Sequence, residues 1–404
     1  MSGVAVLLGL GGVQAEDGYA AQRKQVEALA KLTEAPAMQP AEGFEAEGAL
    51  RAIYFDALDW KGKATKVFAW MGLPESASAE QKVPAMVLVH GGGGTAFKAW
   101  VKKWNERGYA AISIGVEGQT DIRPEKPKEG RYWMPHEWAG PIRHGIYNDS
   151  KPETPLEQQW MYHAVADTIL ANSLMRSLPE VDAEKVGLMG ISWGGVITST
   201  VIGIDDRFAF AIPTYGCGDI SQALNQYGRA LGKNETYKQV WDPALRLDTV
   251  TMPTLWFSWP EDKHFPMDKF ASSYGKVAGP HMVSLIPKMG HGHGPPWTKP
   301  DSYAFAESVL KEGKPWCQQV QLENKGATFS ATFQSTKELD SAQLISTTDT
   351  GVSGKRKWVE SPATLSGQGF TWKASAEVPE GSTAWFINVK ASELTVSSDY
   401  QEAK

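Results

Sequence analysis

The stretch that decides the fold runs from residue 185 to residue 195 and reads Lys185-Val-Gly-Leu-Met-Gly-Ile-Ser-Trp-Gly-Gly195. Its first half is an apolar run typical of a buried strand, and a β-branched segment follows it from Val196. The pattern Gly190-x-Ser192-x-Gly194 is that of a nucleophile elbow, a sharp turn between a strand and a helix. Glycines are required there because a Cβ would collide with the neighbouring strand or helix. We therefore predict Ser192 to be a nucleophile; the alternative is an ordinary glycine-rich turn.

The composition of the whole chain limits the kinds of protein it can be. With 404 residues, the chain is long enough for one large and one smaller domain, and its 42% hydrophobic content supports a sizeable core. A net charge of −6 argues against nucleic acid as a partner. The sequence contains no run of about 20 apolar residues, so we expect no membrane-spanning segment in the mature protein.

The first residues resemble an export signal. The segment 4–13 reads as the apolar region of a secretory signal, and Val13-Gln14-Ala15 fits a cleavage site, although the usual basic residues before the apolar region are missing. We predict residues 1–15 to be a signal-peptide remnant and the protein to be secreted or periplasmic; a disordered chain end is the alternative. Cys217 and Cys317 could pair in an oxidising compartment, but two separate buried thiols fit equally well.

The central part of the chain alternates between strand-like and helical patterns. After an expected N-terminal helical arm at 16–45, this alternation fills residues 46–314 and predicts a mostly parallel sheet covered by helices on both faces. Ligands in such sheets bind at the carboxyl ends of the strands. The expected strands are 50–55, 65–70, 85–89, 110–114, 186–189, 208–212, 254–258 and 282–286, and the main expected helices are 96–107, 157–177 and 302–311.

Three further segments depart from this alternation. Residues 117–155 are rich in Pro, Gly, Trp and charge, and residues 218–242 are polar with a helical pattern. Long insertions in compact domains are usually functional, so either could wall a substrate site. Residues 318–404 show short alternating runs separated by polar turns, which predicts a small antiparallel sandwich of immunoglobulin-like type.

A serine nucleophile needs a base, and the base needs an acid to orient it. After an elbow of this kind, the expected order along the chain is serine, then an acid, then histidine. The loop after the expected strand 254–258 supplies Asp262, with Glu261 as the alternative. A turn or helix-cap role would also explain an aspartate there.

The predicted base follows the last strand of the sheet. There the sequence reads Met289-Gly-His-Gly-His-Gly294, and we predict His291 as the base, with His293 as the second choice and a possible substrate contact. The histidine pair could instead bind zinc, but no carboxylate or cysteine ligand is spaced nearby. We therefore predict neither a metal nor a cofactor.

A run of four glycines after the strand 85–89 predicts an oxyanion hole. His90-Gly-Gly-Gly-Gly94 resembles the HGGG-type loop, whose backbone N–H supplies half of such a hole. We assign this donor to Gly91 or Gly92, and the second donor to the N–H of Trp193, directly after the nucleophile. His90 is expected to brace the loop rather than to take part in chemistry.

Together, these four motifs resemble the α/β-hydrolase superfamily over residues from about 45 to 312. The longer segments 190–195, 205–208, 215–218 and 291–294 resemble bacterial acetylxylan-esterase-like and prolyl-oligopeptidase-like hydrolases. The resemblance implies a serine esterase, commonly a polysaccharide deacetylase, and such proteins often carry a small C-terminal β-domain. Trp259 departs from the pattern, because relatives often have glycine at that position of the acid loop.

Sixteen tryptophans suggest aromatic contacts with sugar rings, although most tryptophans in a chain serve in packing. We predict Trp259, His293 and Trp297 as substrate contacts and expect Trp133 to lie nearby. Arg131, Arg143 and His144 lie in the insertion, and we expect them to form a solvated loop surface; recognition of an acidic substrate is the alternative.

The sequence therefore predicts a serine esterase that removes acetyl groups from a carbohydrate, with a small-molecule or polysaccharide ester as its substrate. A serine exopeptidase of the prolyl-oligopeptidase type is the alternative. The usual propeller of those enzymes does not fit in the ~45 residues before the first core strand, since it needs at least four blades of ~40 residues each. A third interpretation is a carbohydrate-binding protein with an inactive hydrolase fold, which the three retained site residues argue against. The oligomeric state and the role of the C-terminal domain are left open.

Overall fold

The computed structural model describes residues 18–126, 132–147 and 154–403. The predicted signal segment 1–15 and Arg131 lie outside the described residues, so export stays a prediction. Within the described part of the chain, no helix is both long and apolar enough to cross a membrane. Cys217 and Cys317 are two separate buried thiols.

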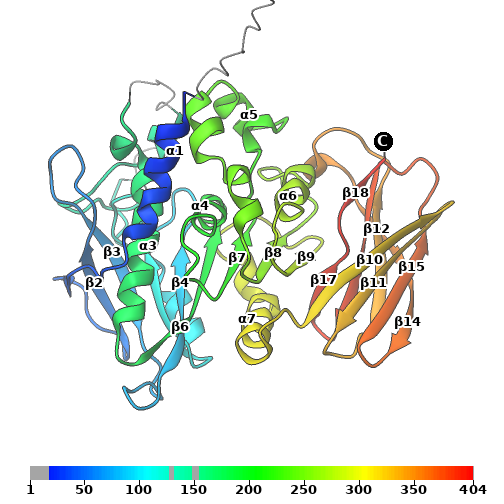
Figure 1. Cartoon of the computed structure of the whole chain (residues 1–404), viewed down its shortest axis with the longest axis horizontal. Coiled ribbons are helices and arrows are strands. Elements are labelled where there is room, and N and C mark those ends of the chain that lie inside the picture. Colours follow the sequence, from blue (N-terminus) through cyan, green and yellow to red (C-terminus); the bar gives the residue numbers. More distant parts are fainter. Residues whose placement is uncertain (1–17, 127–131, 148–153, 404) are drawn as a thin grey trace, which may run out of the picture.

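A nine-stranded sheet forms the centre of the larger domain, in the order β1-β2-β3-β5-β4-β6-β7-β8-β9 (Figure 1). The six strands from β5 to β9 in this order pair in parallel, whereas β1, β2 and β3 pair antiparallel. This arrangement confirms the predicted fold class. The strands are β1 (Met38–Pro40), β2 (Leu50–Asp56), β3 (Lys66–Gly72), β4 (Val83–Val89), β5 (Ala110–Ile114), β6 (Val181–Ile191), β7 (Phe210–Thr214), β8 (Thr254–Ser258) and β9 (His281–Leu285).

Helices cover both faces of this sheet. From β4 to β5 the chain moves towards the β1 edge of the sheet, whereas from β6 to β9 it moves towards the opposite edge. Because such crossovers are right-handed, the helices of these two series lie on opposite faces of the sheet. One face carries α3 packed on α4, and the other carries α2 beside α7, where the rings of Trp104 and Tyr303 lie 4.9 Å apart. The helices are α1 (Ala20–Glu27), α2 (Lys98–Asn105), α3 (Trp160–Ser177), α4 (Trp193–Val201), α5 (Gln226–Leu231), α6 (Met267–Tyr274) and α7 (Asp301–Glu312).

The expected elements agree with these bounds within a few residues, with two differences. The N-terminal arm contains a strand, β1, that the sequence did not predict, because its three exposed residues carry no burial pattern. The elbow strand β6 starts at Val181, five residues before the expected start, because it pairs with β4 beyond an irregularity in register.

The C-terminal part forms two antiparallel sheets, with strand orders β10-β11-β15-β14 and β13-β12-β16-β17. This strand order is that of immunoglobulin-type sandwiches, with β13 as an additional strand beside β12. The inner side chains, such as Phe329, Phe333 and Phe386, are fully buried. The strands are β10 (Cys317–Lys325), β11 (Thr328–Ser335), β12 (Ser341–Thr347), β13 (Val359–Pro362), β14 (Thr364–Gln368), β15 (Thr371–Glu377), β16 (Ala384–Ala391), β17 (Leu394–Ser397) and β18 (Gln401–Glu402), which also pairs with β16.

The sandwich packs against the edge of the large sheet that β9 forms, and it also contacts α6 and α7 (Figure 1). The N–H of Leu285 in β9 donates to the Ser397 hydroxyl at 2.8 Å, and the Asn388 amide donates to the Leu285 carbonyl at 2.9 Å. The buried carboxylate of Asp301 accepts the N–H of Thr395 at 2.8 Å. Side chains of the sandwich therefore satisfy backbone groups that an exposed sheet edge would leave unpaired.

Candidate active site

Ser192 lies at the turn between β6 and α4 in the backbone conformation expected of a nucleophile elbow. Its φ of 60° and ψ of −119° are strained for a residue with a side chain. A Cβ on Gly190 would lie 2.0 Å from the Gly194 carbonyl oxygen, and one on Gly194 would lie 2.2 Å from that of Val89. The two motif glycines are therefore required by close backbone approach on each side of the serine.

The structure brings Ser192, His291 and Asp262 into one hydrogen-bonded chain. The Nε2 atom of His291 lies 3.0 Å from Ser192 Oγ, and its Nδ1 lies 2.8 Å from Asp262 Oδ2. Asp262 is fully buried, and its Oδ1 accepts the backbone N–H groups of His264 at 2.7 Å and Phe265 at 3.0 Å. These donors compensate for the burial of the carboxylate and fix its orientation towards the imidazole.

Trp259, whose predicted contact with the substrate stays a prediction, also contacts the acid of the site. Its indole N–H donates to Asp262 Oδ2 at 3.2 Å, so it is a further donor to the buried acid. Tyr215 contacts the histidine and its loop. Its ring lies 4.6 Å from the His291 ring, and its hydroxyl donates to the Gly290 carbonyl at 2.9 Å. The sequence motifs gave no sign of either contact.

His293 contacts the glycine loop rather than the serine or the acid. Its Nε2 accepts the N–H of Gly91 at 3.0 Å, and its ring packs beside Phe97 at 5.1 Å. Burial, with a smaller contribution from His90, lowers the pKa of His293 to about 4, so it is a neutral acceptor near neutral pH. This arrangement leaves His291 as the histidine with the geometry of a base, and a contact between His293 and the substrate stays a prediction.

The same hydrogen bond corrects the prediction for Gly91, because its N–H is already engaged and cannot also bind an oxyanion. Gly93 donates to Glu117 at 3.1 Å and Gly94 donates to the Gly91 carbonyl at 2.9 Å. Of the four loop glycines, all within the described part of the chain, Gly92 alone has an amide without a protein acceptor. The N–H of Gly92 and that of Trp193, the first residue of α4, are therefore the available pair of donors.

The indole of Trp193 and that of Trp297 are core side chains. Trp193 is 2% exposed and packs edge-on against Trp160 and Tyr227. Trp297 is 7% exposed and lies 4.9 Å from the ring of Trp100. The prediction of Trp297 as a substrate contact is therefore corrected by its burial.

His90 braces the glycine loop. Its Nδ1 lies 2.7 Å from the Gly91 carbonyl, and its Nε2 accepts the N–H of Val116 at 3.0 Å. Burial lowers the pKa of His90 to about 4, so the ring is neutral and both of its nitrogens have partners. This matches the bracing role expected from the sequence.

An ion pair that the sequence motifs did not reveal lies beneath the glycine loop. Glu117 Oε1, in a side chain 3% exposed, accepts both the Gly93 N–H and Arg143 Nε, the latter at 3.2 Å. Burial raises the pKa of Glu117, and the Arg143 charge opposes this rise. Arg143 is 13% exposed and packs against Gly92, so the expected solvated loop surface is wrong for this residue. The pair holds the loop that carries the free Gly92 amide.

Removing this buried acid should destabilise the fold. Glu117→Ala leaves the Arg143 cation and the Gly93 N–H without their acceptor, so we expect the free energy of unfolding to fall by about 3–5 kcal/mol. Glu117→Gln keeps an acceptor oxygen and should lose less. Denaturant-induced unfolding monitored by tryptophan fluorescence measures both changes, and equal stability of Glu117→Ala and the unchanged protein would contradict the assignment.

Aromatic side chains of the insertion surround the outer side of the glycine loop. The ring of Tyr132 packs over Gly93 and is 46% exposed. Trp133 donates its indole N–H to the Gly93 carbonyl at 3.0 Å, and the Arg123 guanidinium lies 4.4 Å from its ring centroid. Ile122 and Met134 of the same insertion are also exposed. The insertion therefore places the exposed ring of Tyr132 next to the glycine loop.

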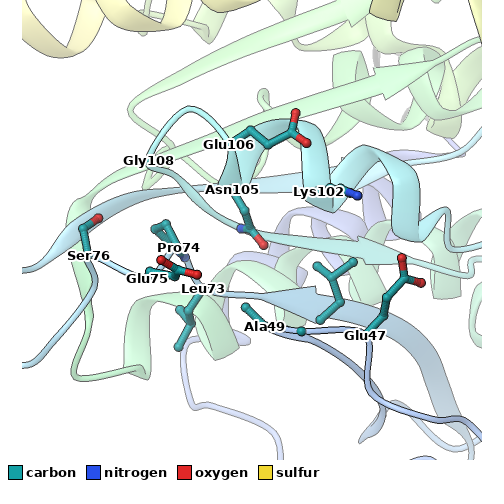
Figure 2. A pocket seen from close by; sticks show the side chains of 12 residues that line it. Glu47, Ala49, Leu73, Pro74, Glu75, Ser76, Lys102, Asn105, Glu106 and Gly108 are labelled. Carbon is teal, nitrogen blue, oxygen red and sulfur yellow. The ribbon is translucent and has the colours of Figure 1, made fainter.

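A cavity of about 620 Å³ lies near the amino end of β5, and Ser192 does not line it. Lys102 and Asn105 from α2 and Glu106 directly after this helix line one side of it, and Glu47 and residues 73–76 line the other (Figure 2). None of the predicted site residues lines this cavity. Among the described residues, no group of three or more His, Cys, Asp or Glu side chains is arranged to hold a metal ion.

Ser192 lies in an elbow at the carboxyl edge of a parallel sheet, and an aspartate and then a histidine follow it along the chain. This combination defines a serine hydrolase of the α/β-hydrolase fold. A family model described as acetyl xylan esterase (AXE1) matches residues 14–240, more than half of the chain. The chain therefore belongs to the acetyl xylan esterase family. The matched segment includes the elbow and the glycine loop but ends before Asp262 and His291.

Solved structures show the same fold at low sequence identity. An acetyl xylan esterase from a Paenibacillus species is 19% identical, with a TM-score of 0.51 over 74% of this chain and 94% of that one. Acetyl xylan esterase 1 from a Thermoanaerobacterium species is 16% identical, with a TM-score of 0.52 over 69% of this chain and 90% of that one.

Two curated relatives share only a segment with this chain. A probable dipeptidyl-peptidase 5 from Aspergillus clavatus is 26% identical over 159 residues, which is 38% of this chain and 18% of that protein. A second one, from Aspergillus terreus, is 24% identical over 159 residues, with the same coverage of both chains. The chain therefore spans less than a fifth of the length of these relatives.

Proposed function

We propose that this enzyme removes acetyl groups from a carbohydrate through an acyl-enzyme formed on Ser192. The observation that carries the proposal is the chain of hydrogen bonds from Ser192 Oγ through His291 to buried Asp262. Membership of the acetyl xylan esterase family supports an acetylated carbohydrate as the substrate.

The geometry supports a two-step mechanism. Ser192 Oγ attacks the ester carbonyl while His291 Nε2 accepts its proton, and Asp262 stabilises the imidazolium that forms. The N–H groups of Gly92 and Trp193 hold the negative oxygen of the tetrahedral intermediate. His291 then gives its proton to the departing sugar oxygen, which leaves the acetyl group on Ser192. A water molecule, deprotonated by His291, then attacks this acyl group; the bond to Ser192 Oγ breaks, His291 returns the proton to Oγ, and acetate is released.

The experiment that tests the proposal measures acetate released from acetylated xylo-oligosaccharides, with p-nitrophenyl acetate and an aminoacyl p-nitroanilide assayed in parallel. Release of acetate from the oligosaccharide that disappears in Ser192→Ala would support the proposal. Activity on the small ester alone would keep the mechanism and reject xylan as the substrate. Preference for the anilide would favour a peptidase, and no activity on any of them would favour a binding protein.

The exposed ring of Tyr132 should contribute to binding of the sugar chain rather than to the reaction. Tyr132→Ala removes an aromatic face beside the glycine loop, so we expect KM for acetylated xylo-oligosaccharides to rise about 5- to 20-fold, the loss of about 1–2 kcal/mol of ring contact. Tyr132→Phe keeps the ring and should behave like the unchanged enzyme. For p-nitrophenyl acetate, which has no sugar chain, kcat/KM should change less than about 2-fold. An equal loss on both substrates would instead show that Tyr132 supports the glycine loop.

A further inference from the structure

The C-terminal sandwich reaches the acid of the site through one short turn. The 3-10 turn η9 (Ser353–Lys355) lies between β12 and β13 and packs against the loop that carries Asp262. A Cβ added to Gly354 would lie 2.0 Å from the carbonyl oxygen of Asp262 and 2.5 Å from the nitrogen of Lys263. The Gly354 backbone is therefore in direct contact with the backbone of the acid, with no space for a side chain.

The same turn also fixes the end of the acid loop. Ser353 is 2% exposed, and its hydroxyl accepts the N–H of Met267, the first residue of α6, at 2.7 Å. The indole N–H of Trp358 donates to the Ser353 carbonyl at 3.1 Å, so a neighbouring side chain of the sandwich stabilises η9. Both ends of the segment from Asp262 to Met267 are therefore held by residues of the other domain.

The shape of this segment controls the direction of the carboxylate. Asp262 Oδ1 accepts N–H groups from His264 and Phe265, which belong to the same segment. A shift of the segment would move these donors, and the carboxylate bonded to them, relative to His291. Since the His291–Asp262 distance is 2.8 Å, a displacement of a few tenths of an ångström weakens the hydrogen bond that orients the base.

We propose that Ser353 and Gly354 are positioning residues of the hydrolase, and that the sandwich serves the reaction by holding Asp262 in place. This inference rests on the proposed function, because it assigns to the sandwich a role in the same catalytic chain. It predicts that a change in the turn lowers the rate of the chemical step without weakening binding of the substrate.

The test compares the full-length enzyme with Gly354→Ala, using p-nitrophenyl acetate. The added methyl group must displace the Asp262 backbone, so we expect kcat to fall about 10- to 100-fold while KM changes less than about 2-fold. The acidic limb of the kcat pH profile should move to lower pH, since a displaced carboxylate stabilises the protonated imidazole less. Ser353→Ala removes only the hydroxyl and should lower kcat about 3- to 10-fold, and it is the variant to rely on if Gly354→Ala does not fold.

A matched control separates positioning from stability. Gly326, in the turn between β10 and β11, has a φ of 62° and no atom within 4 Å of an added Cβ. Gly326→Ala therefore strains the same domain without touching the acid loop, and it should lower the melting temperature but leave kcat and the pH profile unchanged.

Three outcomes distinguish this inference from the proposed function. If the unchanged enzyme shows no Ser192-dependent hydrolysis, the proposed function fails. If it is active and the turn variants keep its kcat and pH profile, this inference alone fails. If Gly326→Ala loses as much kcat as Gly354→Ala, the sandwich acts through general stability, and the positioning role is overturned.

Discussion

Replacing Ser192 by alanine is expected to lower kcat for ester hydrolysis on the order of 10⁵-fold, to a rate supported only by the oxyanion donors and binding. In the proposed mechanism the Ser192 oxygen is the attacking atom, and no other side chain in the described residues is hydrogen-bonded to His291 Nε2. Initial rates with p-nitrophenyl acetate measure the change. A fluorophosphonate probe should label the unchanged enzyme and leave the variant unlabelled.

Ser192→Gly is the matched control for this substitution. Glycine adopts a φ near 60° without strain, so this variant should be as inactive as Ser192→Ala but more stable by about 1 kcal/mol. An alanine variant that keeps more than about 1% of the activity, or that still reacts with the probe, would show that another residue is the nucleophile.

Replacing Asp262 by asparagine is expected to lower kcat by about 10⁴-fold, because it changes the tautomer of the base. Asp262 Oδ2 faces His291 Nδ1 at 2.8 Å, and Oδ1 is held by two backbone N–H groups. An asparagine would keep its oxygen on those N–H groups and turn its NH₂ towards Nδ1. The imidazole proton would then reside on Nε2, which could no longer accept the proton of Ser192.

Glu261 provides the control for Asp262, and it was also the sequence-based alternative for the acid. Its carboxylate accepts the N–H of Lys288 at 3.2 Å and does not contact His291. Glu261→Gln should therefore keep kcat within about 2-fold of the unchanged enzyme. Steady-state kinetics with p-nitrophenyl acetate across pH compare the two variants, and a larger loss in Glu261→Gln than in Asp262→Asn would reverse the assignment.

The confirmed fold class, and the expectation that Ser192, Asp262 and His291 lie close together, came from patterns in which neighbours along the chain determine the structure. Apolar runs predicted the parallel strands because both of their faces are buried, and the elbow motif predicted Ser192 because only glycines allow such a turn. The order serine, acid, histidine then indicated Asp262 and His291, since each follows a strand that ends at the same edge of the sheet. The sandwich followed from short alternating runs.

The errors concern residues whose roles depend on partners far away in the sequence. Gly91 looked like an oxyanion donor, but it gives its N–H to His293, 202 residues later. Trp297 looked like a substrate contact, but its ring is buried against Trp100. An aromatic side chain carries the same sequence signal whether it faces solvent or the core.

The sequence by itself determined the α/β fold, the elbow that carries Ser192 and the strand ends that carry Asp262 and His291, because these follow from local backbone requirements and the period of burial. Only the tertiary structure decided that Gly92 carries the free amide, that Glu117 and Arg143 hold its loop, and that the sandwich contacts the acid. Ser353 and Met267 are 86 residues apart and belong to different domains. Such contacts arise when domains pack, and no pattern of spacing along the chain records which atoms meet.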